Sequence, residues 1–191
     1  MITVKINGEE RQYPQGATYE DVANDYQKEY DNLIALAARD GKIRELFKKL
    51  TRDCEITFFT LKDDVGNKTY VRSATMLFLK AVFDVFGRET VQNCRVEFAI
   101  GNGSYISPKG KINATEENAA KIRNRMRELV EAKTPFLKRS YSLDNAMELF
   151  RREGMKDKEK LFRYRRGSFV NIYEMDGYYD YYYGYMLPNA G

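Results

Sequence analysis

The sequence predicts an α+β fold in two domains, at residues 1–62 and 68–191 of a 191-residue chain. Three observations predict it. Apolar residues alternate with polar ones around an Asn-Gly pair at the start of the chain, which is typical of a β-hairpin. Two long segments repeat apolar residues at helical spacing. Short apolar runs bounded by turn-forming residues recur between them, as strands do.

The first elements are a predicted hairpin and a helix. Residues 2–6 place Ile or Val at every second position, Asn7-Gly8 tolerates the positive φ angles of a tight turn, and residues 9–13 supply the return strand. Thr18 then precedes Tyr-Glu-Asp, which predicts a capped helix start with acids in the first turn. One face of that helix carries Val22, Tyr26 and Tyr30.

Two apolar runs complete the first domain as strands, at residues 33–38 and 53–61. Asp40-Gly41 bounds the first of them as a turn. The order strand, strand, helix, strands suits a small β-grasp sheet wrapped on one helix.

The second domain begins with a strongly apolar helix predicted over residues 71–86. Apolar residues cover most of its circumference, so we expect it to be buried on more than one side, and Gly87 ends it. Residues 96–106 predict a hairpin around Gly101-Asn-Gly103. Asn113 or Thr115 caps the next helix, and Thr134-Pro135 breaks it. Its buried face is predicted to be Ala119, Ile122, Met126, Leu129 and Val130.

Strands and one short helix are expected in the rest of the chain. Residues 136–141 predict a strand, and Ser142 caps a helix that ends at Gly154. Late strands are expected at Phe162, Tyr164, Phe169, Val170, Ile172 and Tyr173. Residues 178–186 are expected to form a last strand. Its alternation places Tyr179, Tyr181, Tyr183 and Tyr185 on one face and Tyr178 and Tyr182 on the other.

Composition limits the chemistry of the chain. It has no histidine and two cysteines, Cys54 and Cys94, too few for a disulfide framework or a Cys/His metal set, so no metal site and no cofactor are expected. A net charge of +4 permits an anionic partner without requiring one. No 18-residue apolar run and no signal peptide are evident, so we expect a cytoplasmic protein without membrane contact.

The order of these elements resembles a known pair of domains. Asn7-Gly8, the Pro14-to-Thr18 entry and the Asp21-Val-Ala23 helix start resemble the TGS module, and residues 115–154 resemble the N-terminal editing domain of threonyl-tRNA synthetase. The resemblance implies a TGS-like β-grasp domain followed by an editing-like domain of helices packed on an antiparallel sheet. Two roles stay open for the TGS-like module: contact with a ligand or RNA, and positioning of its neighbour.

The same resemblance implies a degenerate active site. The family places two histidines four residues apart at a helix start, then a cysteine and a third histidine near the end of the domain. The corresponding residues here are Ser73, Leu77, Tyr182 and Met186. Imidazole and thiolate bind metals and react near neutral pH, whereas these four side chains do neither. Ser73 also lacks an adjacent base, since Lys80 would have to fold back along the helix. We therefore expect a binding groove with no catalytic residue and no metal.

A second resemblance is to the front of bacterial uridine-kinase-like proteins, in which a TGS and an editing-like domain precede a P-loop kinase domain. It implies a C-terminal kinase domain as the partner of this chain, and a fragment cut after Gly191. The 191 residues contain no P-loop motif, so this chain is not expected to phosphorylate a substrate.

Two clusters are candidates for ligand contact. Six tyrosines lie between residues 178 and 185, and the face of Tyr179, Tyr181, Tyr183 and Tyr185 is a candidate for stacking on a nucleobase or for an interface. The alternative is a half-buried strand. Candidate anion contacts, interleaved with aromatic residues, are Arg163, Arg165 and Arg166. The alternative for these arginines is a solvated strand or loop.

The sequence thus predicts a non-catalytic regulatory or ligand-recognition region of a bacterial nucleoside-kinase-like protein, whose groove binds a nucleoside, a nucleotide or RNA. Two alternatives stay open: an RNA- or tRNA-binding module, and a free-standing hydrolase that edits mischarged tRNA. The lack of histidine argues against the hydrolase. The modest net charge argues against strong non-specific RNA binding.

Overall fold

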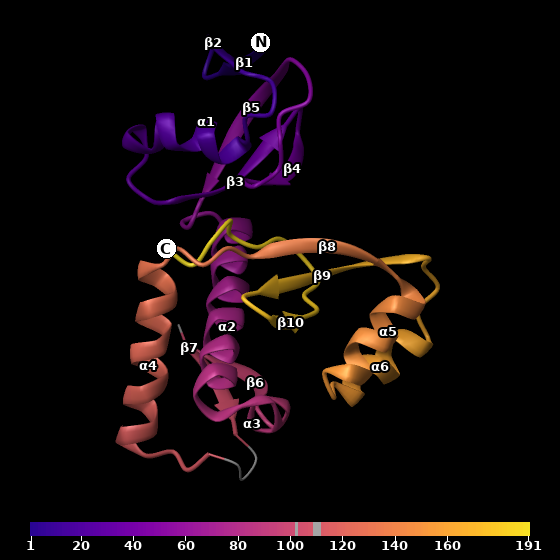
Figure 1. Cartoon of the computed structure of the whole chain (residues 1–191). Helices are drawn as coiled ribbons and strands as arrows, with labels where there is room; N and C mark the ends of the chain where they lie inside the picture. Colours follow the sequence, from indigo (N-terminus) through magenta and orange to yellow (C-terminus); the bar gives the residue numbers. More distant parts are fainter. Residues whose placement is uncertain (102, 109–111) are drawn as a thin grey trace. The chain divides into compact units, whose positions relative to one another are not determined.

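Five strands in the order β2-β1-β5-β3-β4 form the sheet of the first of two compact units (Figure 1). This computed structural model describes residues 1–101, 103–108 and 112–191. The first unit consists of residues 1–74 and 183–189, and the second of residues 75–182 and 190–191. The α+β class predicted from the sequence is confirmed.

The strands and the helix of the first unit follow the predicted order, with one additional strand. They are β1 (Ile2–Ile6), β2 (Glu9–Tyr13), α1 (Tyr19–Tyr26), the 3-10 helix η1 (Gln27–Glu29), β3 (Ile34–Arg39), β4 (Lys42–Glu45) and β5 (Cys54–Thr60). β4 was not predicted, because a four-residue edge strand of mostly charged residues has no hydrophobic alternation. β1 pairs antiparallel with β2 and parallel with β5, as a β-grasp arrangement requires.

Local sequence signals account for the hairpin and the helix start. Asn7 and Gly8 both have positive φ, 51° and 88°, which the tight turn between β1 and β2 requires. The Thr18 side chain accepts a hydrogen bond from the backbone of Asp21, whose carboxylate in turn accepts from the backbone of Thr18. The buried side chains of α1 pack against the sheet in a core that includes Tyr19, Val22, Tyr26, Val4, Ile6, Ala37 and Ile56.

α2 (Asp64–Phe86) begins seven residues before the predicted start at Val71. Gly66 explains the difference. A Cβ at this position would lie 1.9 Å from the carbonyl oxygen of Thr60, so only glycine allows the first turn of the helix to pass this close to the end of β5. A glycine inside a helical pattern argues against a helix in the sequence, and the contact that requires it is tertiary.

The remaining elements belong to the second unit. They are α3 (Arg88–Gln92), β6 (Arg95–Ile100), β7 (Gly103–Ser107), α4 (Glu116–Glu131), β8 (Leu137–Ser142), α5 (Leu143–Arg152), α6 (Lys156–Arg163), β9 (Phe169–Met175) and β10 (Tyr178–Asp180). β8, β9 and β10 form an antiparallel sheet in the order β10-β9-β8, and β6 pairs only with β7 among the described strands. Thr115 and Ser142 cap α4 and α5 as predicted, and Gly87 ends α2 with a φ of 83°. Asn102, in the predicted turn, lies outside the described residues.

Two strand predictions were wrong. Phe162 and Tyr164 were expected in a strand, but Phe162 lies on α6, where it is fully buried against Phe150. The first turn of α6 carries acids and its last turn carries bases, which stabilises a helix through its dipole and outweighs the strand preference of the aromatic residues. The core that α5 and α6 form on the sheet comprises Ala146, Leu149, Phe150, Phe162, Val170 and Ile172.

The last strand was expected to run from residue 178 to 186, but β10 ends at Asp180. The Asp180 carboxylate accepts the backbone N–H of Tyr181 at 2.7 Å, which takes that donor out of the sheet ladder. Gly184, with a φ of 136°, then turns the chain out of the strand conformation. The predicted alternation of six tyrosines on one strand is therefore wrong beyond residue 180.

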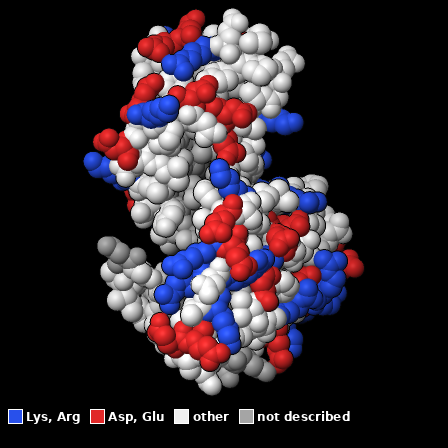
Figure 2. Space-filling view, turned by 60° about the vertical axis from the view of Figure 1, so that its left-hand side comes forward, with Lys and Arg blue, Asp and Glu red and all other residues white. Residues whose placement is uncertain are grey.

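α4 carries charges of both signs, with two acids near each end and four basic residues between them. Figure 2, which brings the α4 side forward, shows Lys and Arg interleaved with Asp and Glu on the visible face. On α4 itself, Lys121 pairs with Glu117 and Arg125 with Glu128. Within the described residues, no helix is long and apolar enough to span a membrane.

Candidate functional site at Ser73

Ser73, the first of the four residues predicted to line a groove, is buried on α2 with 2% of its surface exposed. Its hydroxyl donates to the carbonyl of Thr69 at 2.9 Å and accepts the backbone N–H of Leu187 at 2.9 Å. The sulfur of Met186 lies 4.0 Å from the same oxygen. The hydroxyl proton and one lone pair are therefore both used in hydrogen bonds to backbone groups, of Thr69 and Leu187.

Residues 183–189, here called the strap, belong to the first unit and are fixed there by side chains from three elements. The guanidinium of Arg72 donates to the carbonyl of Tyr185 at 2.6 Å. The buried carboxylate of Glu45 accepts the N–H of Met186 at 3.2 Å, and Glu20 accepts from the side chain of Asn189 at 3.1 Å. Arg72, Glu45 and Ser73 thus satisfy backbone groups of Tyr185, Met186 and Leu187, the part of the strap that includes its two buried residues.

Gly184 lets Arg72 approach the strap. A Cβ on Gly184 would lie 2.6 Å from the central carbon of the Arg72 guanidinium, and its φ of 136° also favours glycine. The hydrogen bond from Arg72 to the Tyr185 carbonyl therefore depends on glycine at the preceding position, Gly184.

This arrangement gives Ser73 no means of acting as a nucleophile. Its proton points to the Thr69 carbonyl, which cannot accept it as a base. The Nζ atom of Lys80, the one base considered from the sequence, is bound to Asp84 at 2.7 Å and to the carbonyl of Asp176 at 2.7 Å. The chemistry that remains at Ser73 is hydrogen bonding.

The structure brings two of the four predicted groove residues together, Ser73 and Met186. Leu77 and Tyr182 belong to the second unit, where Leu77 is buried. The hydroxyl of Tyr182 is buried and makes no hydrogen bond of ordinary geometry among the described residues. Burial, and then the nearby Asp180 carboxylate, raise the pKa of Tyr182 well above 10.0.

Two of the four predicted stacking tyrosines, Tyr179 and Tyr181, are already packed. Tyr181 contacts Phe162 edge-on and receives the guanidinium of Arg165 over its ring. Tyr179 packs on the core of the second unit. Tyr183, on the strap, is 87% exposed, so its ring is the most available of the group.

Of the three predicted anion contacts, two have intramolecular partners. Arg163 pairs with Glu159 at 3.0 Å, and Arg165 donates to the Tyr181 hydroxyl. Arg166 is exposed and forms no ion pair within the part of the chain that the structure describes.

Sequence reasoning missed two carboxylates that hold the strap, Glu45 and Glu20. Glu45 lies on β4, the strand without a sequence signal, and its burial at 3% exposure is a tertiary property. Glu20 was interpreted only as an acid in the first turn of a helix. Nothing in the local sequence of either residue indicates a partner about 140 or 169 positions away.

No group of three Cys, Asp or Glu side chains that could hold a metal ion is found in the described ranges. Cys54 and Cys94 are unpaired, and burial raises the pKa of both thiols. Raised thiol pKa values reduce the thiolate fraction and with it nucleophilic reactivity.

Comparison with known proteins gives a consistent set of relatives. The chain is similar along its whole length to threonine–tRNA ligases. It is 29% identical over 195 residues to the ligase of Thermotoga maritima, with all of the chain and 29% of the ligase covered. It is 28% identical over 193 residues to that of Maricaulis maris, with 100% of the chain and 30% of the ligase covered. The chain thus spans less than a third of the length of these relatives. No protein-family model matches it.

These relatives confirm the resemblance to threonyl-tRNA synthetase that the sequence indicated. The finer assignments, to a TGS module and to a kinase parent, find no support among them.

Proposed function

We propose that the chain is a tRNA-binding module that does not hydrolyse aminoacyl-tRNA. The observation that carries this proposal is similarity to threonine–tRNA ligases over the entire chain. The proposal includes a TGS-like first domain at residues 1–62 and an editing-like second domain at residues 68–191. The proposal also includes a cytoplasmic location for the protein.

The contacts of Ser73 support the non-catalytic part of the proposal. A hydrolase would need a base, a nucleophile or an activated water. Ser73 is held between the Thr69 carbonyl and the Leu187 N–H, and Met186 beside it neither titrates nor activates water. By the resemblance, a histidine of the family corresponds to Ser73, whose hydroxyl here holds the backbone of the strap.

The prediction that this chain is the N-terminal region of a kinase has less support than this proposal. The relatives reported above are named threonine–tRNA ligases. Their names favour the RNA- or tRNA-binding alternative. A kinase domain as partner, and a nucleoside or nucleotide as ligand, remain predictions from the sequence resemblance alone.

Binding of a fluorescently labelled threonine-accepting tRNA, followed by anisotropy, tests the proposal. We expect a dissociation constant on the order of micromolar that weakens as salt rises, because phosphate contacts release counterions. A protein of similar size and net charge controls for simple charge attraction. Absence of binding at low salt would overturn the proposal.

A deacylation assay tests the lack of chemistry separately. Seryl-tRNA incubated with the protein should lose serine at the uncatalysed rate, and Ser73→Ala should behave identically. Turnover in the wild type that the variant lacks would show that Ser73 acts in hydrolysis.

A further inference from the structure

The positive charge of the chain is concentrated in one segment of the second unit. Residues 151–169 contain eight Lys and Arg and three Asp and Glu, against 32 and 28 in the whole chain. This segment therefore carries a net charge of +5, and the rest of the chain carries −1. It comprises the end of α5, all of α6 and the connection to β9.

Intramolecular ion pairs use about half of these bases. Glu159 pairs with both Arg151 and Arg163, and Lys158 pairs with Asp180 at 2.8 Å. Arg152 pairs with Glu153. Within the described residues, four exposed bases of this segment have no ion pair: Lys156, Lys160 and Arg166, and also Arg165, whose contacts are with aromatic rings.

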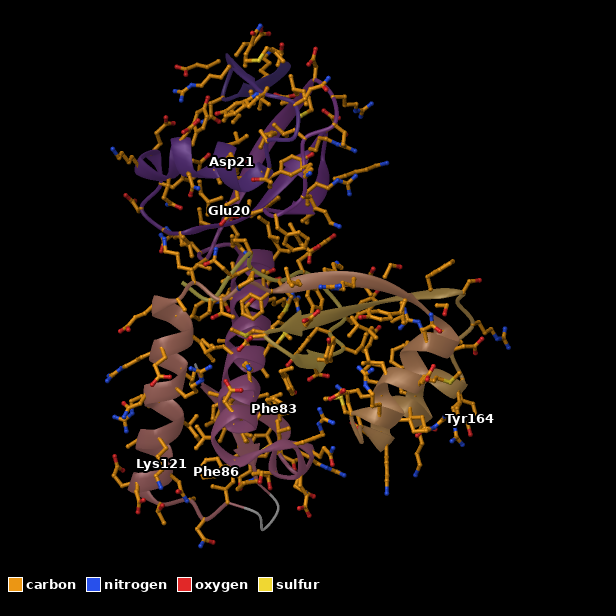
Figure 3. The ribbon with its side chains drawn as sticks, in the orientation of Figure 1. Glu20, Asp21, Phe83, Phe86, Lys121 and Tyr164 are labelled. Atoms are coloured by element: carbon orange, nitrogen blue, oxygen red, sulfur yellow. The ribbon has the colours of Figure 1, made fainter. Side chains whose placement is uncertain are left out.

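An uncovered aromatic ring lies among these free charges. Tyr164, directly after α6, is 88% exposed and stands at the outer edge of the α5–α6 pair (Figure 3). Phe169, which opens β9, is 68% exposed. Every residue of the connection between them is exposed.

The connection is nevertheless anchored, by Arg165. Its guanidinium lies over the rings of Phe162 and Tyr181, at 5.5 and 5.3 Å, and donates to the Tyr181 hydroxyl. Among the described residues, the neighbours of this anchor, Tyr164 and Arg166, make no such contact with the unit. A fixed loop with an outward ring and an outward cation suits a ligand that offers a flat face beside a negative charge.

We propose that Tyr164, Lys160 and Arg166 form a contact surface for unpaired nucleotides of RNA. The Tyr164 ring stacks on a base, and the two cations contact the adjoining phosphates. A protein partner would fit less well, since the centres of protein interfaces are depleted in Lys. This inference rests on the proposed tRNA binding and assigns it a surface.

The test compares single-residue variants by anisotropy, with the labelled tRNA, a short single-stranded RNA and a blunt RNA duplex. Tyr164→Ala should weaken binding of the single strand roughly 5- to 150-fold, the range for loss of one stacked base. Tyr164→Phe keeps the ring and should bind like the wild type. The duplex, which offers no unpaired base, should respond little to either change.

Charge variants and matched controls complete the test. Lys160→Ala with Arg166→Ala should lower affinity and flatten the salt dependence, whereas Lys121→Ala on α4 should do neither. Tyr183→Ala removes an equally exposed tyrosine, 87% against 88%, and should leave binding within about twofold of wild type.

The outcomes separate the two proposals. Loss of binding with Tyr183→Ala but not with Tyr164→Ala would move the stacking site to the strap and overturn the inference. If the protein binds tRNA but no variant of Tyr164, Lys160 or Arg166 changes that binding, the inference is overturned and the proposed function is retained. No binding of tRNA by the wild type would overturn both. Because all three residues are exposed, the variants should fold, which circular dichroism checks.

Discussion

The hydroxyl of Ser73 accepts the backbone N–H of Leu187 at 2.9 Å, although 114 positions separate the two residues. This small buried hydroxyl joins α2 to the strap and satisfies a backbone donor that burial would otherwise leave unpaired. Ser73 should therefore be tested as a residue that affects stability rather than reaction rate.

Ser73→Ala should lower the free energy of unfolding by about 1–3 kcal/mol, the cost of leaving the Leu187 N–H buried without an acceptor. Urea unfolding measures the change, and amide hydrogen exchange should quicken specifically at residues 183–189. Ser140→Ala, at an exposed position on β8, is the control and should change stability by less than about 0.5 kcal/mol. If amide hydrogen exchange in the strap is unchanged, the Ser73 hydroxyl does not hold the strap in place.

Gly184→Ala should destabilise the protein more than Gly16→Ala does. Both glycines have positive φ, so both substitutions strain the backbone, but a Cβ at Gly16 meets nothing within 4 Å and one at Gly184 meets the Arg72 guanidinium. The additional cost should be about 1–3 kcal/mol, as for other overpacked sites. Because the clash is with Arg72, the Arg72→Ala background should remove most of this difference in a double-mutant cycle. Equal costs for the two glycines would refute the clash.

Lys80→Met tests the buried charge network of the second unit. Lys80, with 3% of its side chain exposed, pairs with Asp84 at 2.7 Å and Asp176 at 3.1 Å, and Arg125 also contacts Asp84. Removing one partner of a buried pair leaves uncompensated charge, so we expect a loss of about 3 kcal/mol in thermal or urea unfolding. Lys121→Met is the control. It breaks the Lys121–Glu117 pair, which has the same i,i+4 spacing but a Lys side chain that is 51% exposed, and it should have no measurable effect on stability. Similar effects of both variants would contradict a role for burial.

Alkaline pH should destabilise the second unit through its buried tyrosines. Burial is the main cause that raises the pKa of both Tyr178 and Tyr182, so their neutral forms are favoured in the fold. Their contribution to stability is complete below the ordinary tyrosine pKa of 10.0 and is lost as the pH rises from there toward the raised values.

Tyr182→Phe should therefore keep or increase stability near pH 8, since its hydroxyl has no hydrogen-bond partner of good geometry, and should reduce the loss seen near about pH 11. Tyr178→Phe also loses the hydrogen bond to Asp180 at 3.3 Å and should be weaker than the wild type near pH 8. Urea unfolding at both pH values, with tyrosinate absorbance, measures this. A pH dependence in Tyr182→Phe identical to the wild type would disprove the assignment.

Removal of metal ions should leave the protein unchanged. Without added magnesium, chelator treatment is expected to alter neither the unfolding midpoint nor tRNA binding. The reason is that the predicted groove residues Ser73, Leu77, Tyr182 and Met186 are not among the common zinc ligands. Elemental analysis after purification without chelator provides the direct check. Stoichiometric zinc would contradict this expectation.

The sequence by itself determined the elements whose signals are local. The Asn7-Gly8 turn, the Thr18 capping box, the Ser142 cap and the Gly87 end of α2 were all predictable, because each depends on residues within one turn of chain. The sequence also showed which reactive side chains are missing, since the absence of histidine requires no coordinates.

The tertiary structure decided the contacts whose partners lie far apart in sequence. Ser73 is engaged because Leu187 returns to it, and the N–H of Met186 meets the buried carboxylate of Glu45. The early start of α2 at Gly66 and the early end of β10 at Asp180 depend on nearby residues instead, through backbone contacts that a hydrophobic pattern does not reveal. A hydrogen-bond partner supplied from another part of the chain leaves no periodicity in the local sequence. That is the physical reason why the fold class could be predicted here, while the contacts of Ser73 with the strap could not.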